Sequence, residues 1–185
     1  MSLDYDVKEH LDSVLTEIQW ERGNLQYKLD PLQQSISQKL ASLTFKRAAI
    51  LSSRQIGKSY WNSTDALEFL AQKPGKIARI VAPTLDQCSD IVNDNLSPII
   101  ADAPKGFINR VKSEYRWDLY NGSSLRLGGL KRAHVDSNRG GNASLVIYGD
   151  LWFVDAKSFS YGFQQLCWPH ISEERLVGKE WLIWL

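Results

Sequence analysis

Cysteine is scarce in this sequence, and its two cysteines are too far apart in the chain to suggest a shared site. Cys88 and Cys167 are the only ones, and neither belongs to a C-x-x-C pair. This spacing argues against a disulfide framework and against a zinc site. We therefore expect two free, structural thiols in a reducing compartment.

Long apolar runs and an excess of charge of either sign are also missing. No apolar run approaches the length of a membrane-spanning helix or a secretion signal, so the sequence predicts a cytoplasmic protein without membrane contact. The 22 Lys and Arg residues nearly balance the 21 Asp and Glu residues, which leaves a net charge of +1. Any contact with nucleic acid would then depend on a local basic patch.

The chain is long and apolar enough for one folded domain, and its N-terminal part has the period of helices. It has 185 residues, of which 43% are hydrophobic. Apolar residues at helical spacing predict a helix over Tyr5–Trp20, and Glu21–Lys28 is interpreted as a polar link. Asp30, followed by a proline in the first turn, predicts a second helix over Pro31–Leu43.

After this helix the apolar pattern changes to short runs that alternate with helical segments. Such runs are typical of parallel strands buried on both faces, so the sequence predicts an α/β fold with a mainly parallel sheet. The expected strands are Ala48–Leu51, Ile77–Ala82, Ser144–Tyr148 and Trp181–Leu185, and the expected helices are Tyr60–Ala71 and Asp86–Ile100. An Asn121-Gly122 turn predicts a β-hairpin between Arg116–Tyr120 and Ser124–Leu127.

The residues after the first predicted strand have the chemistry of a phosphate-binding loop. They read Ser52-Ser53-Arg54-Gln55-Ile56-Gly57-Lys58-Ser59. A Walker A loop needs a lysine for the β and γ phosphates, a hydroxyl for Mg²⁺ and a helix N-terminus behind them. Ser52 stands where the G-x-x-x-x-G-K-[ST] pattern has its first glycine, and a lone G-K-S tripeptide also occurs in ordinary turns. The strand in front and the helix behind favour a nucleotide site.

Five segments of the chain carry a further pattern: Leu29–Gln33, Ser53–Ser59, Val81–Gln87, Tyr120–Leu127 and Asp136–Gly140. In this order they resemble the ATPase domain of the large terminase subunit, the DNA-packaging motor of tailed bacteriophages. The second segment is very close to the S-R-Q-x-G-K-[ST] form of this family, which also lacks the first glycine. The resemblance implies a three-layer P-loop NTPase fold of the RecA-like (ASCE) type over residues 29–185, after an N-terminal helix and link over residues 1–28.

The resemblance also implies roles for residues in and near the loop. ATP and Mg²⁺ would be the ligands, with Lys58 on the β and γ phosphates, Ser59 on Mg²⁺ and Arg54 on the γ phosphate. Gln33 would read the adenine, and Arg139 lies in a loop expected to couple to the nucleotide or to a neighbouring subunit. Further nucleotide contacts are expected from Ser53, Gln55, Gly57 and Tyr60.

One carboxylate of the family's acidic pair is missing from this sequence. In such motors the first carboxylate holds Mg²⁺ through water and the second polarises the attacking water. An ungapped count puts Gly149 at the metal aspartate and Asp150 at the catalytic glutamate, which leaves Asp150 as the one catalytic and metal-binding carboxylate. Asp155 is the nearest other candidate, although a helix cap is the simpler interpretation. We therefore expect ATP binding with slow hydrolysis or none.

By resemblance, the function is ATP-driven movement of double-stranded DNA into a prohead in the cytoplasm of a bacterial host. The implied partners are DNA, the portal protein, the small terminase subunit and further copies of the chain in a ring on the portal. The sequence ends on a predicted strand, before the coupling motif and nuclease domain of this family. This ending predicts an isolated domain, a shortened prophage relic or a frameshifted product.

Two other interpretations of the whole chain stay open. One is a degenerate nucleotide-binding remnant without motor activity, which Gly149 favours. The other is a fragment of a superfamily 2 helicase, although the D-E-x-[HD] box of those enzymes is absent.

A separate hypothesis is a local patch of basic and aromatic residues that faces DNA. The alternatives for these residues are a solvated hairpin edge or a contact with the nucleotide. The candidates for the patch are Arg110, Lys112 and Arg116 with Tyr115 and Trp117, and a second cluster of Lys131, Arg132 and His134.

Overall fold

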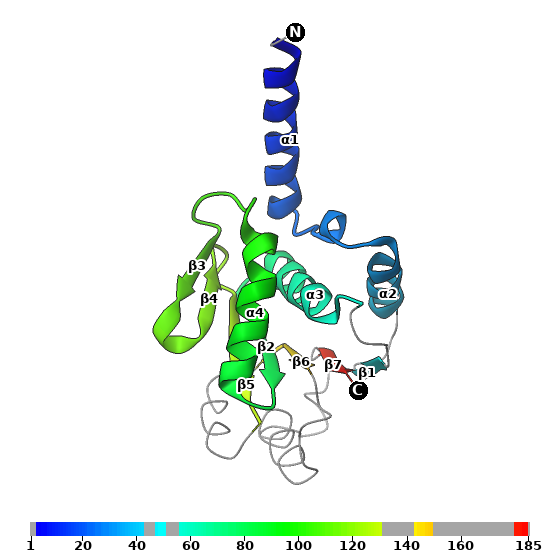
Figure 1. The fold of residues 1–185 in the computed structure, drawn as a ribbon, viewed down its shortest axis with the longest axis vertical. Helices are drawn as coiled ribbons and strands as arrows, with labels where there is room; N and C mark the ends of the chain where they lie inside the picture. Colours follow the sequence, from blue (N-terminus) through cyan, green and yellow to red (C-terminus); the bar gives the residue numbers. More distant parts are fainter. Residues whose placement is uncertain (1–2, 43–46, 51–55, 131–142, 150–179, 185) are drawn as a thin grey trace.

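The computed structural model describes residues 3–42, 47–50, 56–130, 143–149 and 180–184 of the chain (Figure 1). Its α-helices are α1 (Leu3–Glu21), α2 (Pro31–Ser42), α3 (Lys58–Gln72) and α4 (Leu85–Ile100), with short 3₁₀ helices at Gln26–Lys28 and Lys112–Glu114. Its strands are β1 (Arg47–Ile50), β2 (Ile77–Ala82), β3 (Ile108–Val111), β4 (Arg116–Leu119), β5 (Ser124–Gly129), β6 (Leu145–Tyr148) and β7 (Glu180–Trp184).

The described strands form one mixed sheet in the order β1-β7-β6-β2-β5-β4-β3. Neighbouring strands are parallel along β1-β7-β6-β2-β5, and β4 and β3 then add to β5 in antiparallel pairings. The prediction of an α/β fold with a mainly parallel sheet is therefore confirmed. The predicted last strand is confirmed as well, since β7 lies between β1 and β6, with Ala49 opposite Ile183.

One strand of the sheet was not predicted. β3 has the sequence Ile-Asn-Arg-Val, and its two central residues, Asn109 and Arg110, are exposed. Among the described strands it is the last in the order, paired only with β4. A strand at the edge of a sheet does not need the apolar residues that mark a central strand, and charged residues there discourage edge-to-edge association. The absence of an apolar pattern is the reason the sequence did not reveal it.

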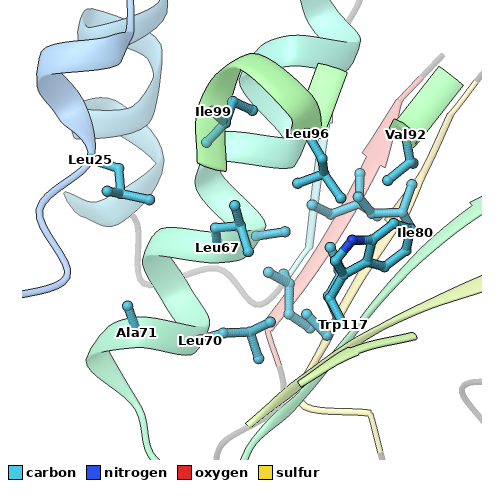
Figure 2. Close-up of a cluster of buried hydrophobic side chains, with 14 of the residues drawn as sticks. Leu25, Leu67, Leu70, Ala71, Ile80, Val92, Leu96, Ile99 and Trp117 are labelled. Carbon is cyan, nitrogen blue, oxygen red and sulfur yellow. The ribbon is translucent and has the colours of Figure 1, made fainter. Parts of the chain in front are cut away.

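The hydrophobic core lies between the sheet and the pair of helices α3 and α4. Helical spacing places Leu67 and Leu70 on one face of α3. Leu96 of the neighbouring helix α4 belongs to the same buried core. Figure 2 shows these leucines close to Ile80 of β2 and Trp117 of β4. Burial of each such side chain stabilises the fold by roughly 1.5–3 kcal/mol. This packing holds α3 against the strands.

The tip of the β4–β5 hairpin closes the C-terminal end of α3. Asn121 Nδ2 donates to the carbonyls of Leu70 (2.8 Å) and Ala71 (3.1 Å), while its Oδ1 accepts from the Ser123 amide. Gly122 has φ +78°, a left-handed conformation that favours glycine. The predicted Asn-Gly turn is confirmed, and its asparagine also satisfies carbonyls that the last turn of a helix leaves unpaired.

The N-terminal helix is confirmed, but most of its apolar face is exposed. Val7, Leu11 and Leu15 are each more than half exposed, and α1 extends away from the sheet (Figure 1). Its C-terminal end is anchored by Trp20, which is fully buried and donates from Nε1 to Asp102 at 3.1 Å. None of the helices in the described ranges is long and apolar enough to cross a membrane.

Candidate functional site

The candidate site begins where the chain enters α3. Gly57 has φ 72° and ψ 27° and directly precedes Lys58, the first residue of the helix. The left-handed backbone conformation favours glycine, and a Cβ at this position would also lie 2.7 Å from Nε2 of Gln33 and would displace that side-chain amide. Trp61 donates from its amide to the Gly57 carbonyl at 3.0 Å, which is the first hydrogen bond of the helical ladder.

Gln33 of α2 holds the end of this loop. It is 7% exposed, and its Nε2 donates to the carbonyls of Ile56 (3.2 Å) and Gly57 (3.4 Å). Its Oε1 accepts from the Asp30 amide at 3.2 Å. Both ends of the side-chain amide are therefore used within the protein. The predicted contact with adenine stays a prediction, and the contact with the loop is a role that sequence reasoning missed.

A cavity opens beside the first two turns of α3. The cavity has a volume of about 40 Å³, which exceeds the roughly 10–15 Å³ that one water requires. The polar residues of its wall are Lys58, Ser59, Asn62 and Ser63 of α3, and the carboxyl ends of β2 and β6 contribute Val81, Ala82 and Gly149. Ligands of open α/β sheets bind at this edge.

Ser59 and Gly149, the two positions expected near a metal, line the same cavity. The Gly149 amide donates to the Val81 carbonyl at 2.8 Å, which holds the end of β6 against β2. Within the described ranges no group of three His, Cys, Asp or Glu side chains could hold a metal ion. A hydroxyl beside a lysine nevertheless fits Mg²⁺ that arrives with phosphates, because this ion keeps several waters and needs few protein ligands.

Several predicted residues do not line this cavity or cannot be placed. Tyr60 is half-buried and packs against the hydrophobic core, and burial, followed by the nearby Asp102 carboxylate, raises the pKa of its phenol. The predicted residues outside the described ranges are Ser53, Arg54, Gln55, Lys131, Arg132, His134, Arg139, Asp150, Asp155 and Cys167.

The prediction of a structural thiol is confirmed for Cys88 on α4. Its side chain is buried and unbridged, and its Sγ donates to the Ile80 carbonyl at 3.2 Å. Burial raises the pKa of this thiol to about 12. The thiol therefore stays protonated and unreactive at neutral pH.

One member of the DNA-facing patch expected around β4, Trp117, cannot stack on bases. Trp117 is buried in the core, where no base can stack on its ring. Arg116 forms ion pairs with Glu114 and Asp118, so its charge is already balanced. Arg110 is exposed and lies over the Trp117 ring at 5.3 Å. These contacts favour the alternative, a solvated hairpin edge.

A buried carboxyl links α2 to α3 behind the site. Asp65 accepts a hydrogen bond from Ser37 Oγ at 2.9 Å, and Ser37 in turn accepts from Trp61 Nε1 at 2.6 Å. Burial is the main cause that raises the pKa of Asp65 to about 7, and the nearby Glu68 adds to it, against the opposing hydrogen bond from Ser37. The folded protein therefore favours the neutral acid.

Replacement of Asp65 by asparagine should stabilise the protein at pH 8 and change little at pH 4. The carboxyl of Asp65 has a pKa of about 7 in the folded protein and 3.8 in the unfolded chain. The neutral acid therefore stabilises the folded wild type fully below pH 3.8, and this stabilisation is lost as the pH rises through about 7. The loss amounts to about 4 kcal/mol at most. Urea unfolding of the wild type and Asp65→Asn across this range measures it. Asp90→Asn, at an exposed position of α4, should keep the wild-type slope, and an unchanged slope in Asp65→Asn would contradict the argument.

Comparisons with known proteins identify the fold. No protein-family model matches the sequence, and no curated protein matches it significantly. A variant of the large terminase ATPase domain of Thermus phage P74-26 is 23% identical over 86% of this chain and 66% of that chain, with a TM-score of 0.58. The HK97 bacteriophage large terminase is 16% identical, with 84% and 32% covered and a TM-score of 0.64.

A third solved structure is the large terminase of the thermophilic bacteriophage D6E in complex with ADP. It is 11% identical over 84% of this chain and 38% of that chain, with a TM-score of 0.61. The chain thus spans less than two fifths of the HK97 and D6E proteins. The chain has the fold of the ATPase domains of phage large terminases, a RecA-like α/β fold with a mainly parallel sheet.

Proposed function

We propose that the chain is the ATP-binding domain of a phage or prophage large terminase subunit, which powers movement of double-stranded DNA into a prohead. The observation that carries this proposal is the position of Lys58 and Ser59. Both lie in the first turn of α3 and line a cavity at the carboxyl ends of β2 and β6, in a fold shared with large terminases. A helix N-terminus with a lysine and a hydroxyl suits a nucleotide phosphate.

The nucleotide would be held mainly by the loop before α3. Lys58 would pair with the β and γ phosphates and Ser59 with Mg²⁺, which would neutralise charge on the transferred phosphate. Arg54 would reach the γ phosphate, and Gln33 would contact the adenine. Further nucleotide contacts would come from Ser53, Gln55, Gly57 and Tyr60. Arg139 would couple to the nucleotide or to a neighbouring subunit. Because Gln33 also bonds to the loop carbonyls, a change at the base would reach the phosphate loop directly.

A second candidate function is nucleotide binding without motor activity, and Gly149 is the observation that favours it. This glycine lines the cavity where a motor has its metal aspartate, so Asp150 alone would supply a carboxylate. A superfamily 2 helicase fragment is the weaker alternative, because its acidic box is absent. By family resemblance the partners of the motor are DNA, the portal protein, the small subunit and further copies of the chain, in the host cytoplasm.

Separate measurements of nucleotide binding and turnover test the proposal. Calorimetry should detect ATP and ADP binding in the presence of Mg²⁺, while phosphate release should be slow and rise when double-stranded DNA is added. Binding with no turnover, with or without DNA, would favour the remnant over the motor. Absence of any nucleotide binding would refute both.

A further inference from the structure

Asn62 is a feature of the cavity wall that the roles proposed so far do not explain. The residue is 6% exposed, it lines the cavity, and its Oδ1 has no hydrogen-bond partner. A buried polar atom left without a partner costs about 1–3 kcal/mol, and such atoms are rare in native proteins. Because Asn62 also lines an open space, a donor that occupies this space when the site is filled would satisfy the oxygen.

The position of Asn62 on α3 places it on the same side of the helix as the phosphate-binding residues. It lies four residues after Lys58 and three after Ser59, and residues at these spacings are neighbours on a helix surface. Asparagine is less favourable than leucine inside a helix. An apolar residue would therefore fill this buried position better if the position served packing alone.

Gly149 contributes to the same cavity and carries no side chain to hold a metal. Mg²⁺ bound to phosphates keeps several of its waters, and those waters need acceptors. The amide oxygen of Asn62 is such an acceptor. Rotation about the Cβ–Cγ bond exchanges the oxygen and the nitrogen of the amide, so a donor in the cavity selects the orientation that presents the oxygen.

We propose that Asn62 is a positioning residue that accepts a hydrogen bond from a water of nucleotide-bound Mg²⁺, in place of the carboxylate that Gly149 lacks. This inference rests on the proposed nucleotide site. It assigns the metal a neutral acceptor, which anchors Mg²⁺ more weakly than a carboxylate does. Metal binding would then survive the loss of the aspartate even if hydrolysis does not.

The test compares ADP affinity in Mg²⁺ with ADP affinity in EDTA, both measured by calorimetry. The ratio of the two dissociation constants reports how strongly the metal supports nucleotide binding. In Asn62→Leu the affinity in EDTA should stay at the wild-type value, while the ratio should fall by roughly three- to tenfold, which is the contribution of one hydrogen bond. A wild-type ratio in Asn62→Leu would overturn the inference.

Asn62→Asp keeps the shape of the side chain and adds a negative charge. It provides a second measurement if Asn62→Leu folds poorly. Its ratio should exceed that of the wild type, and an unchanged or smaller ratio would overturn the inference. Asn109→Leu, at an exposed position of β3, is the matched control and should leave the ratio unchanged. Failure of the wild type to bind ADP at all would instead refute the proposed function itself.

Discussion

Lys58→Ala should weaken ATP binding by roughly a hundredfold. Lys58 is the first residue of α3 and lines the cavity beside Ser59. Hydrogen bonds between charged groups contribute about 1.5–3 kcal/mol each, and about 2.7 kcal/mol corresponds to a hundredfold change in affinity. The amide groups at the helix N-terminus remain in the variant, so weak phosphate binding should persist. Calorimetry at fixed salt and fixed Mg²⁺ measures the difference.

Lys76→Ala is the matched control for this substitution. It removes the same charge from an exposed position beyond the opposite end of α3, and it should bind ATP as the wild type does. Thermal unfolding of both variants shows whether the fold is kept. Equal ATP affinity of Lys58→Ala and the wild type would show that the phosphates bind elsewhere.

The order of helices and central strands could be predicted because each of them carries its own pattern. Buried parallel strands such as β2 and β6 are short apolar runs, and an Asn-Gly turn marks the β4–β5 hairpin. β3 carries no such pattern, because a strand at the edge of a sheet does not need apolar residues. The exposure of the apolar face of α1 could not be predicted either, because helical spacing shows which residues share a face and not what covers that face.

Some features of the site depend on adjacent residues and could be predicted from the sequence, whereas others depend on contacts between distant residues and could not. Gly57, Lys58 and Ser59 could be found because their chemistry depends on adjacent residues in one turn. The bonds from Gln33 to the loop carbonyls join residues 23 and 24 positions apart, and no spacing rule predicts them. Asn62 could have been suspected from one signal, a polar residue at a buried helical position. The stacking role suggested for Trp117 is excluded by its burial. The sequence could not show this, because an aromatic residue next to basic residues gives the same pattern whether its ring is exposed or buried.

Restoring the acidic pair with Gly149→Asp and Asp150→Glu should raise ATP hydrolysis by roughly a hundredfold or more. A positioned acid or base commonly contributes at least a hundredfold in rate, and preorganised charge at the transferred phosphate adds to it. Among the residues that the structure describes, a Cβ on Gly149 would meet only the Val81 carbonyl, at 3.9 Å, which is ordinary van der Waals contact. Glutamate at position 150 has a side chain one carbon longer than that of aspartate.

The informative measurement is kcat of the double variant and of the parent at saturating ATP and Mg²⁺. Gly149→Asn combined with Asp150→Glu is the matched control, because asparagine has nearly the size of aspartate without its charge, and its kcat should rise much less than that of the double variant. If the parent already hydrolyses ATP at the rates of an active motor, Gly149 does not stand at the metal position. Another carboxylate must then act, and Asp155→Asn would be the first substitution to test, because loss of activity there would move the catalytic base beyond β6.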